Sequence, residues 1–320
     1  MNRILVWCPL LEADVSLLQK QSYRVERLDR AESMGAAVLT AHVRRFDALM
    51  VGLSPVTAEM LTGGQLKVVA RFGIGIDTVD VEAATKAGVM VTNTPGASKV
   101  GVAELAIGLM FSLARKLPQH HVWTKAGDWQ GQVGFELAGK TLGLVGLGQV
   151  GKEVARRAVC LEMRVIAHDI AWDQDFAGRH EIKRGSLETV LSQSDLVSLH
   201  VPSTPETIGL VGKEELGMMK KGAMLINTAR GNLVVEEALH KALLSEHLGG
   251  AALDVLATEP PEGNPLLGLD QVILSPHQGG ETRESLQNYS RMCTQNVLAA
   301  LQGNRPPNLI NPEALARREE

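Results

Sequence analysis

The chain has 320 residues, of which 45% are hydrophobic, 21% are charged and only 3% are aromatic, and its formal net charge at pH 7 is −4. This length exceeds what one hydrophobic core usually organises, so two domains are expected. The slightly acidic balance and the few aromatic rings argue against a nucleic-acid-binding protein.

The first hundred residues alternate short apolar runs with helix-like segments. Near-continuous β-type runs at 4–7, 48–53, 67–71 and 89–93 suit parallel strands that are buried on both faces. Helical patterns occur between runs, at 57–64 and 79–88, and a glycine closes the second where a C-cap is expected. This order predicts a βα-repeating domain with a parallel sheet.

A long apolar segment, ASKVGVAELAIGLMFSLARK at 97–116, predicts a helix. Its apolar residues cover most of the circumference, so we expect burial between two layers or two subunits. A second series of strands is then predicted at 141–148, 164–169, 196–201, 223–229, 251–256 and 272–276. With helical patterns between most of them, these six strands indicate a doubly wound nucleotide-binding sheet. A last helix is expected over 282–303.

Cysteine usage and the N-terminus suggest a cellular location. Cys8, Cys160 and Cys293 lie far apart and form no CxxC or Cys/His cluster, which predicts reduced, mostly buried thiols without a disulfide or metal site. The start MNRILVWCPL lacks the pattern of a signal peptide, and no run approaches the roughly 18 uncharged apolar residues of a membrane span. We therefore expect a cytoplasmic protein that does not bind membranes.

Residues 146–151 read GLGQVG, the pattern G-x-G-x-x-G, between a predicted strand and a predicted helix. Gly146 would make the tight turn, Gly148 would let the backbone approach a pyrophosphate, and Gly151 would allow close helix–strand packing. The next strand ends at Asp169, which can accept hydrogen bonds from both adenosine ribose hydroxyls. The residues directly after it include no arginine for a 2′-phosphate, so NAD is predicted rather than NADP.

Ligands of a doubly wound sheet lie beyond the carboxyl ends of its strands. Those ends place Arg230, Asp254 and His277 at one crevice, and Glu259 follows shortly after Asp254. Arginine can bind a carboxylate and polarise a carbonyl, and histidine can exchange the proton that accompanies hydride transfer. A nearby carboxylate stabilises the imidazolium form. This set predicts nicotinamide chemistry on a small α-keto acid.

Five motifs in order resemble the signatures of the D-isomer-specific 2-hydroxyacid dehydrogenase family: TLGLVGLGQVG, HVPSTPETIGLVG, INTARGNLVVEEAL, AALDVLATEPP and LSPHQGG. That family includes phosphoglycerate dehydrogenases and glyoxylate/hydroxypyruvate reductases. The upstream stretches LKVVARFGIGIDTVD and NTPGASKVGVAELAIGLM extend the resemblance over nearly the whole chain.

The resemblance implies a role for each matching residue. Arg230 would hold the substrate carboxylate or carbonyl, His277 would be the acid/base, and Glu259 would be its partner. The loop Gly73, Ile74 and Gly75 would bind the substrate carboxylate, and a glycine loop at a strand end can form an anion-binding nest. The residues implied to bind NAD are Gly146, Gly148, Gln149, Val150, Gly151, Asp169, His200, Val201, Pro202, Thr207, Thr228, Ala229, Asp254, Gly279 and Gly280.

The resemblance also implies an α/β fold of two doubly wound parallel-sheet domains. A Rossmann-type NAD domain (99–285) would be inserted into a flavodoxin-like substrate domain (1–98 and 286–320). The helix at 97–116 would be an interdomain and dimer element of a homodimer. Closure of the domains would exclude water before hydride transfer.

One departure from the family pattern bears on the substrate. Phosphoglycerate-type members commonly carry an arginine in the loop after the second strand, whereas 51–55 reads VGLSP. A small unphosphorylated 2-hydroxy or 2-keto acid is therefore at least as strongly indicated as a phosphorylated one. Gln278 is also unusual, and its neighbour position to His277 could alter the pocket rim.

Two alternative functions stay open. The first is a formate- or phosphite-type dehydrogenase, against which the His277–Glu259 pair weighs because formate oxidation needs little acid/base chemistry. The second is a non-catalytic NAD(H)-sensing, corepressor-like protein, which could keep the cofactor motif and lose turnover.

Overall fold

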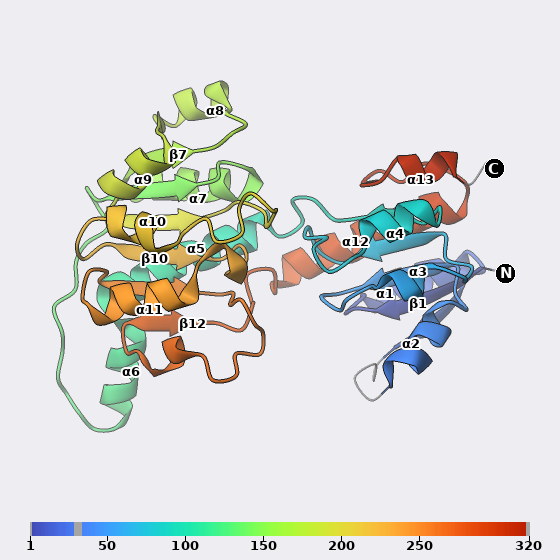
Figure 1. Cartoon of the computed structure of the whole chain (residues 1–320), viewed down its shortest axis with the longest axis horizontal. Coiled ribbons are helices and arrows are strands. Elements are labelled where there is room, and N and C mark those ends of the chain that lie inside the picture. Colours follow the sequence, from blue (N-terminus) through green and yellow to red (C-terminus); the bar gives the residue numbers. More distant parts are fainter. Residues whose placement is uncertain (1, 29–33, 318–320) are drawn as a thin grey trace. The chain divides into compact units, whose positions relative to one another are not determined.

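The computed structural model describes residues 2–28 and 34–317 (Figure 1). The chain divides into two compact units: unit 1 comprises Met1–Ser98 with Gly280–Glu320, and unit 2 comprises Lys99–Gly279. The second break therefore lies between Gly279 and Gly280 rather than at 285/286, so two adjacent predicted cofactor residues fall in different units.

Unit 1 is built on a five-stranded parallel sheet in the order β2-β1-β3-β4-β5, the flavodoxin-like order. Its strands are β1 (Arg3–Trp7), β2 (Arg24–Arg27), β3 (Ala48–Val51), β4 (Val68–Arg71) and β5 (Met90–Thr92). Its helices are α1 (Glu12–Lys20), α2 (Ala36–Val43), α3 (Ala58–Leu61), α4 (Val81–Lys86), α12 (Arg283–Leu301) and α13 (Glu313–Ala316).

Helices cover both faces of this sheet, which explains its continuous apolar strands. Alternate strand residues point to opposite faces: Ile4 and Val6 pack with α1 and α12, whereas Leu5 packs with α2, α3 and α4. Cys293 of α12 is fully buried in the first of these cores. The last long helix thus completes the unit that the first hundred residues begin.

Unit 2 is built on a seven-stranded parallel sheet in the order β12-β11-β10-β9-β6-β7-β8. Its strands are β6 (Thr141–Val145), β7 (Arg164–His168), β8 (Lys183–Arg184), β9 (Leu196–Leu199), β10 (Met224–Asn227), β11 (Gly250–Leu253) and β12 (Val272–Leu274). Strand order reverses between β6 and β9, which is the topological switch point where doubly wound sheets bind ligands. The prediction of two doubly wound parallel-sheet domains is confirmed.

Two faces of this sheet carry separate cores, one with α5 and α7 and the other with α9, α10 and α11. The helices of unit 2 are α5 (Lys99–Arg115), α6 (Leu117–Lys125), α7 (Gln149–Cys160), α8 (Gln174–Arg179), α9 (Leu187–Gln193), α10 (Lys213–Met218) and α11 (Glu236–Leu244), with 3₁₀ turns η2 (Gly231–Leu233) and η3 (Pro265–Gly268).

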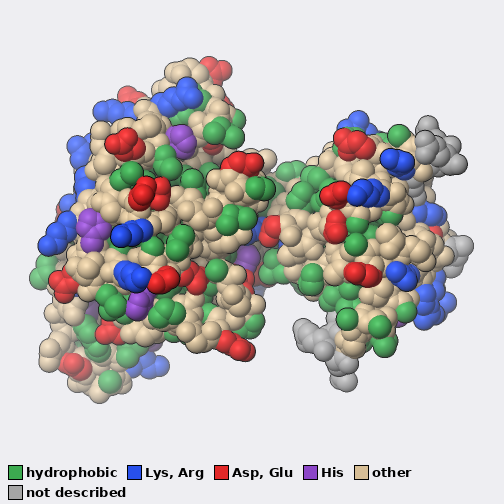
Figure 2. Space-filling model, in the orientation of Figure 1, with side chains coloured by type: hydrophobic (Ala, Val, Ile, Leu, Met, Phe, Trp, Pro, Cys, Tyr) green, Lys and Arg blue, Asp and Glu red, His purple; other side chains and the backbone are tan. Residues whose placement is uncertain are grey.

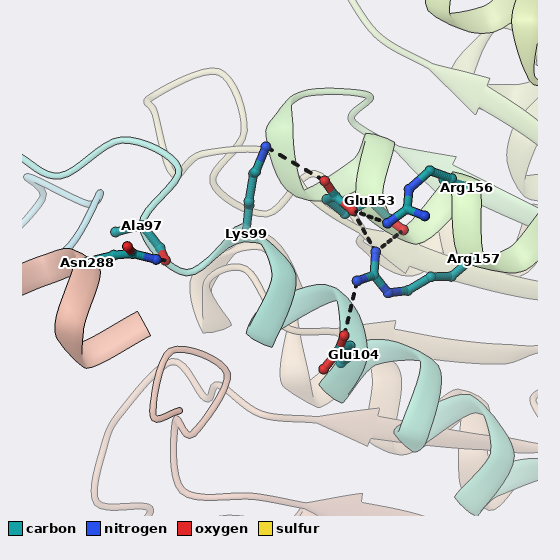
Figure 3. A network of polar contacts seen from close by, with 7 residues as sticks. All are labelled: Ala97, Lys99, Glu104, Glu153, Arg156, Arg157 and Asn288. Carbon is teal, nitrogen blue, oxygen red and sulfur yellow. Dashed lines mark hydrogen bonds and ion pairs between the residues drawn. The ribbon is translucent and has the colours of Figure 1, made fainter. Parts of the chain in front are cut away.

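Ion pairs connect α5 to α7 within unit 2 (Figure 3). Arg157 reaches Glu104 at 3.0 Å and Glu153 at 2.6 Å, and Arg156 reaches Glu153 at 2.9 Å. Lys99 at the start of α5 lies 3.7 Å from the same Glu153. The hydrogen bond from Arg156 is the largest cause that lowers the pKa of Glu153, to about 2; burial opposes it and Arg157 adds to it. Charge pairing thus adds to the apolar packing of α5 on α7.

Sequence patterns missed two strands, β2 (Arg24–Arg27) and β8 (Lys183–Arg184). Both lie at an edge of their sheets and read RVER and KR. Edge strands have a side without a partner strand and commonly carry charges, so they lack the apolar run that marks a central strand. The expected burial of the cysteines is wrong for Cys160, which is exposed at the end of α7.

Charged side chains of both signs are scattered over the face shown in Figure 2. Lys and Arg side chains lie among Asp and Glu side chains there, and several Lys and Arg side chains lie next to one another along the upper left edge. Among the helices in the described ranges, none is long and apolar enough to cross a membrane.

Candidate active site

At two glycines of the turn after β6, the neighbouring backbone leaves no room for a side chain. At Gly146, which has a φ of 102°, an added Cβ would lie 2.6 Å from the carbonyl oxygen of His200. At Gly151 it would lie 2.2 Å from the carbonyl oxygen of Gly146. A side chain at either position would collide with backbone, which explains why these two positions are glycine.

Gly148 differs, because a Cβ there would meet no heavy atom within 4 Å. It is the N-cap residue of α7 and supplies no side-chain hydrogen bond to the helix. The first N–H groups of a helix have no partner inside the helix, and they bind phosphate well when no side chain caps them. The turn therefore fits a dinucleotide pyrophosphate at the N–H groups of Gln149 and Val150.

Asp169 follows β7 and is bonded to the glycine turn. Its Oδ2 accepts a hydrogen bond from the N–H of Leu147 at 2.5 Å, and its Oδ1 accepts one from Ala171 at 2.7 Å. Both oxygens retain lone pairs for a ribose hydroxyl. A cavity of about 400 Å³ opens here, lined by His168, Asp169, Arg184, Gly185 and Ser186. Arg184 is not among the cofactor residues predicted from the sequence.

The ends of β9 and β10 hold several predicted cofactor residues. His200 Nε2 lies 2.9 Å from Ser198 Oγ, and burial lowers the pKa of His200 to about 4. The hydroxyl of Thr207 donates to the carbonyl of Pro202 at 2.7 Å and closes the loop after β9, which also contains Val201. The imidazole of His200 is therefore neutral at pH 7, as suits a contact with apolar or uncharged groups of a ligand.

Thr228 carries a buried polar atom that the described residues leave unsatisfied. The residue is 7% exposed, and its Oγ1 has no hydrogen-bond partner. An unpaired buried hydroxyl is costly, which points to a ligand atom as its partner. The loop around it is fixed by Asn227, whose side chain accepts from the N–H of Ala229 at 3.0 Å and donates to the carbonyl of Arg230 at 2.8 Å.

Arg230 lies in the loop between β10 and η2. Its Nη1 donates to the carbonyl of Ala229 at 2.7 Å, and the side chain is partly exposed. At the next residue, Gly231, an added Cβ would lie 1.9 Å from the backbone of Leu256. The loops after β10 and β11 therefore pack directly on each other, which fixes the backbone from which Arg230 extends.

His277 and Glu259 form the titratable pair of the site. His277 Nδ1 lies 2.8 Å from Glu259 Oε2, and Glu259 Oε1 accepts a hydrogen bond from the N–H of Leu256 at 3.0 Å. With Nδ1 bound to a carboxylate, Nδ1 is the donor and Nε2 is the atom that can exchange a proton with a ligand. The pair is 25% and 37% exposed, so a ligand can reach it.

Asp254 holds the loop that carries His277. This aspartate is 2% exposed, and its carboxylate accepts hydrogen bonds from Ser275 Oγ at 2.6 Å, Gln278 N at 2.8 Å and Gly279 N at 2.8 Å. His277 also donates its N–H to the carbonyl of Asp254 at 2.8 Å, and its φ is 56°. A left-handed non-glycine residue costs about 1–3 kcal/mol and persists only where its surroundings enforce it. Asp254 supplies that enforcement.

The Gln278 side chain turns back on its own loop. Its Nε2 donates to the carbonyl of Pro276 at 3.1 Å. In this arrangement the amide is occupied by a local hydrogen bond.

In unit 1, the loop after β4 carries the predicted substrate residues. Ile74 is 48% exposed, and its carbonyl accepts a hydrogen bond from Asn93 at 2.8 Å. The N–H of Gly73, however, donates to Thr94 Oγ1 at 3.0 Å. To bind a substrate carboxylate through its N–H, Gly73 would have to share this hydrogen bond or exchange it for one to the carboxylate.

Gly280, also in unit 1, packs so closely on Tyr289 that a Cβ would lie 2.6 Å from the phenol oxygen.

Residues 107–279, more than half of the chain, match the family model described as "D-isomer specific 2-hydroxyacid dehydrogenase, NAD binding domain". A glyoxylate reductase of Korarchaeum cryptofilum is 38% identical, over 87% of this chain and 86% of its own length. A D-3-phosphoglycerate dehydrogenase of Archaeoglobus fulgidus is 38% identical over 97% of this chain, but the chain spans only 59% of that relative. A solved D-lactate dehydrogenase from Aquifex aeolicus, complexed with NAD and lactic acid, is 26% identical and superposes with a TM-score of 0.86 over 97% of this chain and 99% of its own.

Proposed function

Because the chain belongs to the D-isomer-specific 2-hydroxyacid dehydrogenase family, we propose that it is an NAD-dependent oxidoreductase that interconverts a D-2-hydroxy acid and its 2-keto acid. The observation that carries this proposal is the 2.8 Å contact between His277 Nδ1 and Glu259 Oε2 beyond the carboxyl ends of the strands of unit 2. Neither a formate-type reaction nor a cofactor-sensing role requires an acid/base pair, so both alternatives are disfavoured.

The side chains of unit 2 supply the proton chemistry and the binding of the acid. In the oxidation direction, His277 Nε2 takes the proton of the substrate hydroxyl, and in reduction it returns a proton to the carbonyl oxygen. Glu259 orients the ring and stabilises the imidazolium that forms. Arg230 binds the carboxylate and polarises the carbonyl. When bound, NAD accepts or donates the hydride.

The glycine turn and the strand ends would hold the cofactor. Gly148 leaves room for the pyrophosphate at the N-terminus of α7, and the remaining lone pairs of Asp169 would accept from the ribose. The unsatisfied hydroxyl of Thr228 would contact the same ligand. The other predicted cofactor residues are retained as part of this proposal.

A small unphosphorylated acid is the substrate class that we favour. The loop after β3, at 52–55, has no basic side chain. Three other basic residues could compensate, and each has a partner in the protein. Arg71, at the end of β4, is 2% exposed and donates to the carbonyl of Phe72 at 3.1 Å. Arg44 donates to the carbonyl of Glu59 at 2.8 Å, and Lys99 lies 3.7 Å from Glu153. Glyoxylate, hydroxypyruvate and short-chain 2-keto acids are therefore our preferred candidates. The relatives include both a glyoxylate reductase and a D-3-phosphoglycerate dehydrogenase, so this preference rests on the loop and not on them.

A homodimer is the assembly that we propose. None of the residues of α6, all of which the structure describes, is buried. Apolar side chains of α6 and the loop after it are exposed, namely Leu117, Val122, Trp129 and Val133. Exposed apolar surface of this extent is typical of a protein–protein interface. The cytoplasmic location expected from the sequence stays a prediction.

The function is tested by NADH oxidation with a panel of 2-keto acids, followed by the His277→Ala variant. We expect turnover with at least one unphosphorylated acid, and a fall of kcat by roughly 10²–10⁴ in the variant with NADH affinity nearly unchanged. His240→Ala, on α11, is the matched control and should retain wild-type rates. Wild-type turnover in His277→Ala would remove this residue from the mechanism.

The same NADH assay also tests the alternative without catalysis. If NADH binds but no 2-keto acid supports its oxidation, the enzyme proposal fails and the corepressor-like alternative gains.

A further inference from the structure

The cavity beside Asp169 brings together two side chains that are far apart in the sequence. Strands β7 and β8 pair in parallel, with Ala167 opposite Arg184, so their carboxyl ends lie at the same edge of the sheet. Asp169 continues from β7, and Arg184 ends β8. Both line the cavity of about 400 Å³, together with His168, Gly185 and Ser186. An acidic and a basic residue thus line one space.

The carboxylate of Asp169 is hydrogen-bonded to the backbone on both oxygens. Its two oxygens accept the N–H groups of Leu147 and Ala171, at 2.5 and 2.7 Å. These bonds fix the carboxylate against the glycine turn and satisfy part of its hydrogen-bonding capacity. The side chain keeps its negative charge and can still accept from a ribose hydroxyl.

Arg184 is not paired directly with a carboxylate of the described residues. Within the ranges that the structure describes, no ion pair of Arg184 with Asp or Glu is found, and the residue is exposed. Its Cζ lies 5.3 Å from the centre of the Trp172 ring, a distance typical of a cation–π contact. Such a contact restricts the guanidinium without removing its charge or its hydrogen-bond donors. The cavity therefore has a partly oriented cation at its rim.

We propose that this cavity accepts an adenosine ribose with a 2′-phosphate as well as one with a 2′-hydroxyl, so that the protein uses NADP(H) in addition to NAD(H). Arg184 is the residue that determines this tolerance, and the proposal rests on the dehydrogenase function proposed above. A 2′-hydroxyl donates to Asp169, whereas a 2′-phosphate accepts charge-assisted hydrogen bonds from Arg184.

The two side chains have opposite effects on the two cofactors. Asp169 repels a 2′-phosphate, so NAD(H) remains the preferred cofactor. Arg184 offsets that repulsion for a phosphate and contributes little to a neutral ribose. Removal of the guanidinium should therefore weaken one cofactor selectively, which a general loss of structure would not do.

The test measures nucleotide binding by titration calorimetry, without turnover, using 5′-AMP and adenosine 2′,5′-bisphosphate as probes. The variant is Arg184→Gln. The matched control is Lys183→Gln, because Lys183 is the preceding residue of β8, points to the opposite face and does not line the cavity. We expect the wild type to bind both nucleotides. Arg184→Gln should lose about tenfold or more in affinity for the bisphosphate and less than about threefold for 5′-AMP, while Lys183→Gln stays like the wild type.

Steady-state kinetics give the second readout. The ratio of kcat/KM with NADPH to that with NADH should fall about tenfold or more in Arg184→Gln and stay constant in Lys183→Gln. The proposal is overturned if the wild type binds 5′-AMP but not the bisphosphate, or if both variants weaken the bisphosphate equally. Failure of the dehydrogenase function would appear instead as absence of turnover with either cofactor, while the calorimetric comparison would still decide the role of Arg184.

Discussion

His200 is a single residue whose environment makes stability depend on pH. Its ring lies 2.9 Å from the hydroxyl of Ser198, and burial lowers its pKa to about 4. In the unfolded chain a histidine has a pKa of about 6.5. As pH falls below 6.5 the unfolded state binds the proton first, so folding stability is lost between pH 6.5 and about 4.

The variant His200→Gln should remove that dependence. Each pH unit in this window corresponds to at most about 1.4 kcal/mol, so the wild type should lose about 2 kcal/mol from this histidine between pH 7 and pH 5. Urea unfolding at several pH values measures the loss. The readout is the slope with pH rather than the absolute stability, which the substitution itself could lower. A slope that stays unchanged in His200→Gln would contradict this account.

At the scale of an element, the turn that joins β6 to α7 contains two kinds of glycine: Gly151 is required by packing, and Gly148 is predicted to be required by the cofactor. Gly148→Ala meets open space and has a φ of −70°, which alanine also adopts, so the free energy of unfolding should change by less than about 1 kcal/mol. The added methyl would nevertheless occupy the approach to the pyrophosphate, and NADH affinity should fall about tenfold or more.

Gly151→Ala provides the contrast within the same turn. The new Cβ would lie 2.2 Å from the carbonyl oxygen of Gly146, so we expect a loss of about 1–3 kcal/mol in the free energy of unfolding. Urea unfolding and NADH fluorescence titration distinguish the two variants. Wild-type NADH affinity in Gly148→Ala would show that the pyrophosphate does not lie at this turn.

Central and edge elements differ in how well their sequences reveal them. The runs ALMV of β3 and MLIN of β10 are buried at every position, so an apolar run marks them directly. The edge strand β8 reads KR, and both residues are exposed. Its existence depends on pairing with β7, which no local pattern expresses. For that reason Arg184 was absent from the predicted cofactor site.

At the scale of the whole molecule, the exposed apolar residues of α6 and its following loop predict a dimer. Val122→Asp would place a charge in the proposed interface and should convert a dimer, twice the 34.4 kDa of one chain, into a monomer. Size-exclusion chromatography with light scattering measures the mass. Leu244→Asp, an equally exposed leucine at the end of α11, is the control and should stay dimeric. A monomeric wild type would exclude this interface.

Sequence alone determined the fold class and the family, because the signals for both are local. Continuous apolar runs identify buried parallel strands, and the spacing of Gly146, Gly148 and Gly151 between a strand and a helix identifies the dinucleotide turn. The roles of Arg230, Glu259 and His277 were predicted from their places at or near strand ends and from the family resemblance. They stay predictions, supported by the contact between the last two.

Tertiary structure alone decided which distant groups meet and what they are bonded to. It placed Arg184 at the cavity of Asp169, engaged the N–H of Gly73 with Thr94, and showed that Asp254 holds the loop of His277. The physical reason is that crossover helices bring strands from remote parts of the chain side by side. Hydrogen bonds and charges at their ends depend on that neighbourhood, which a short window of sequence does not contain.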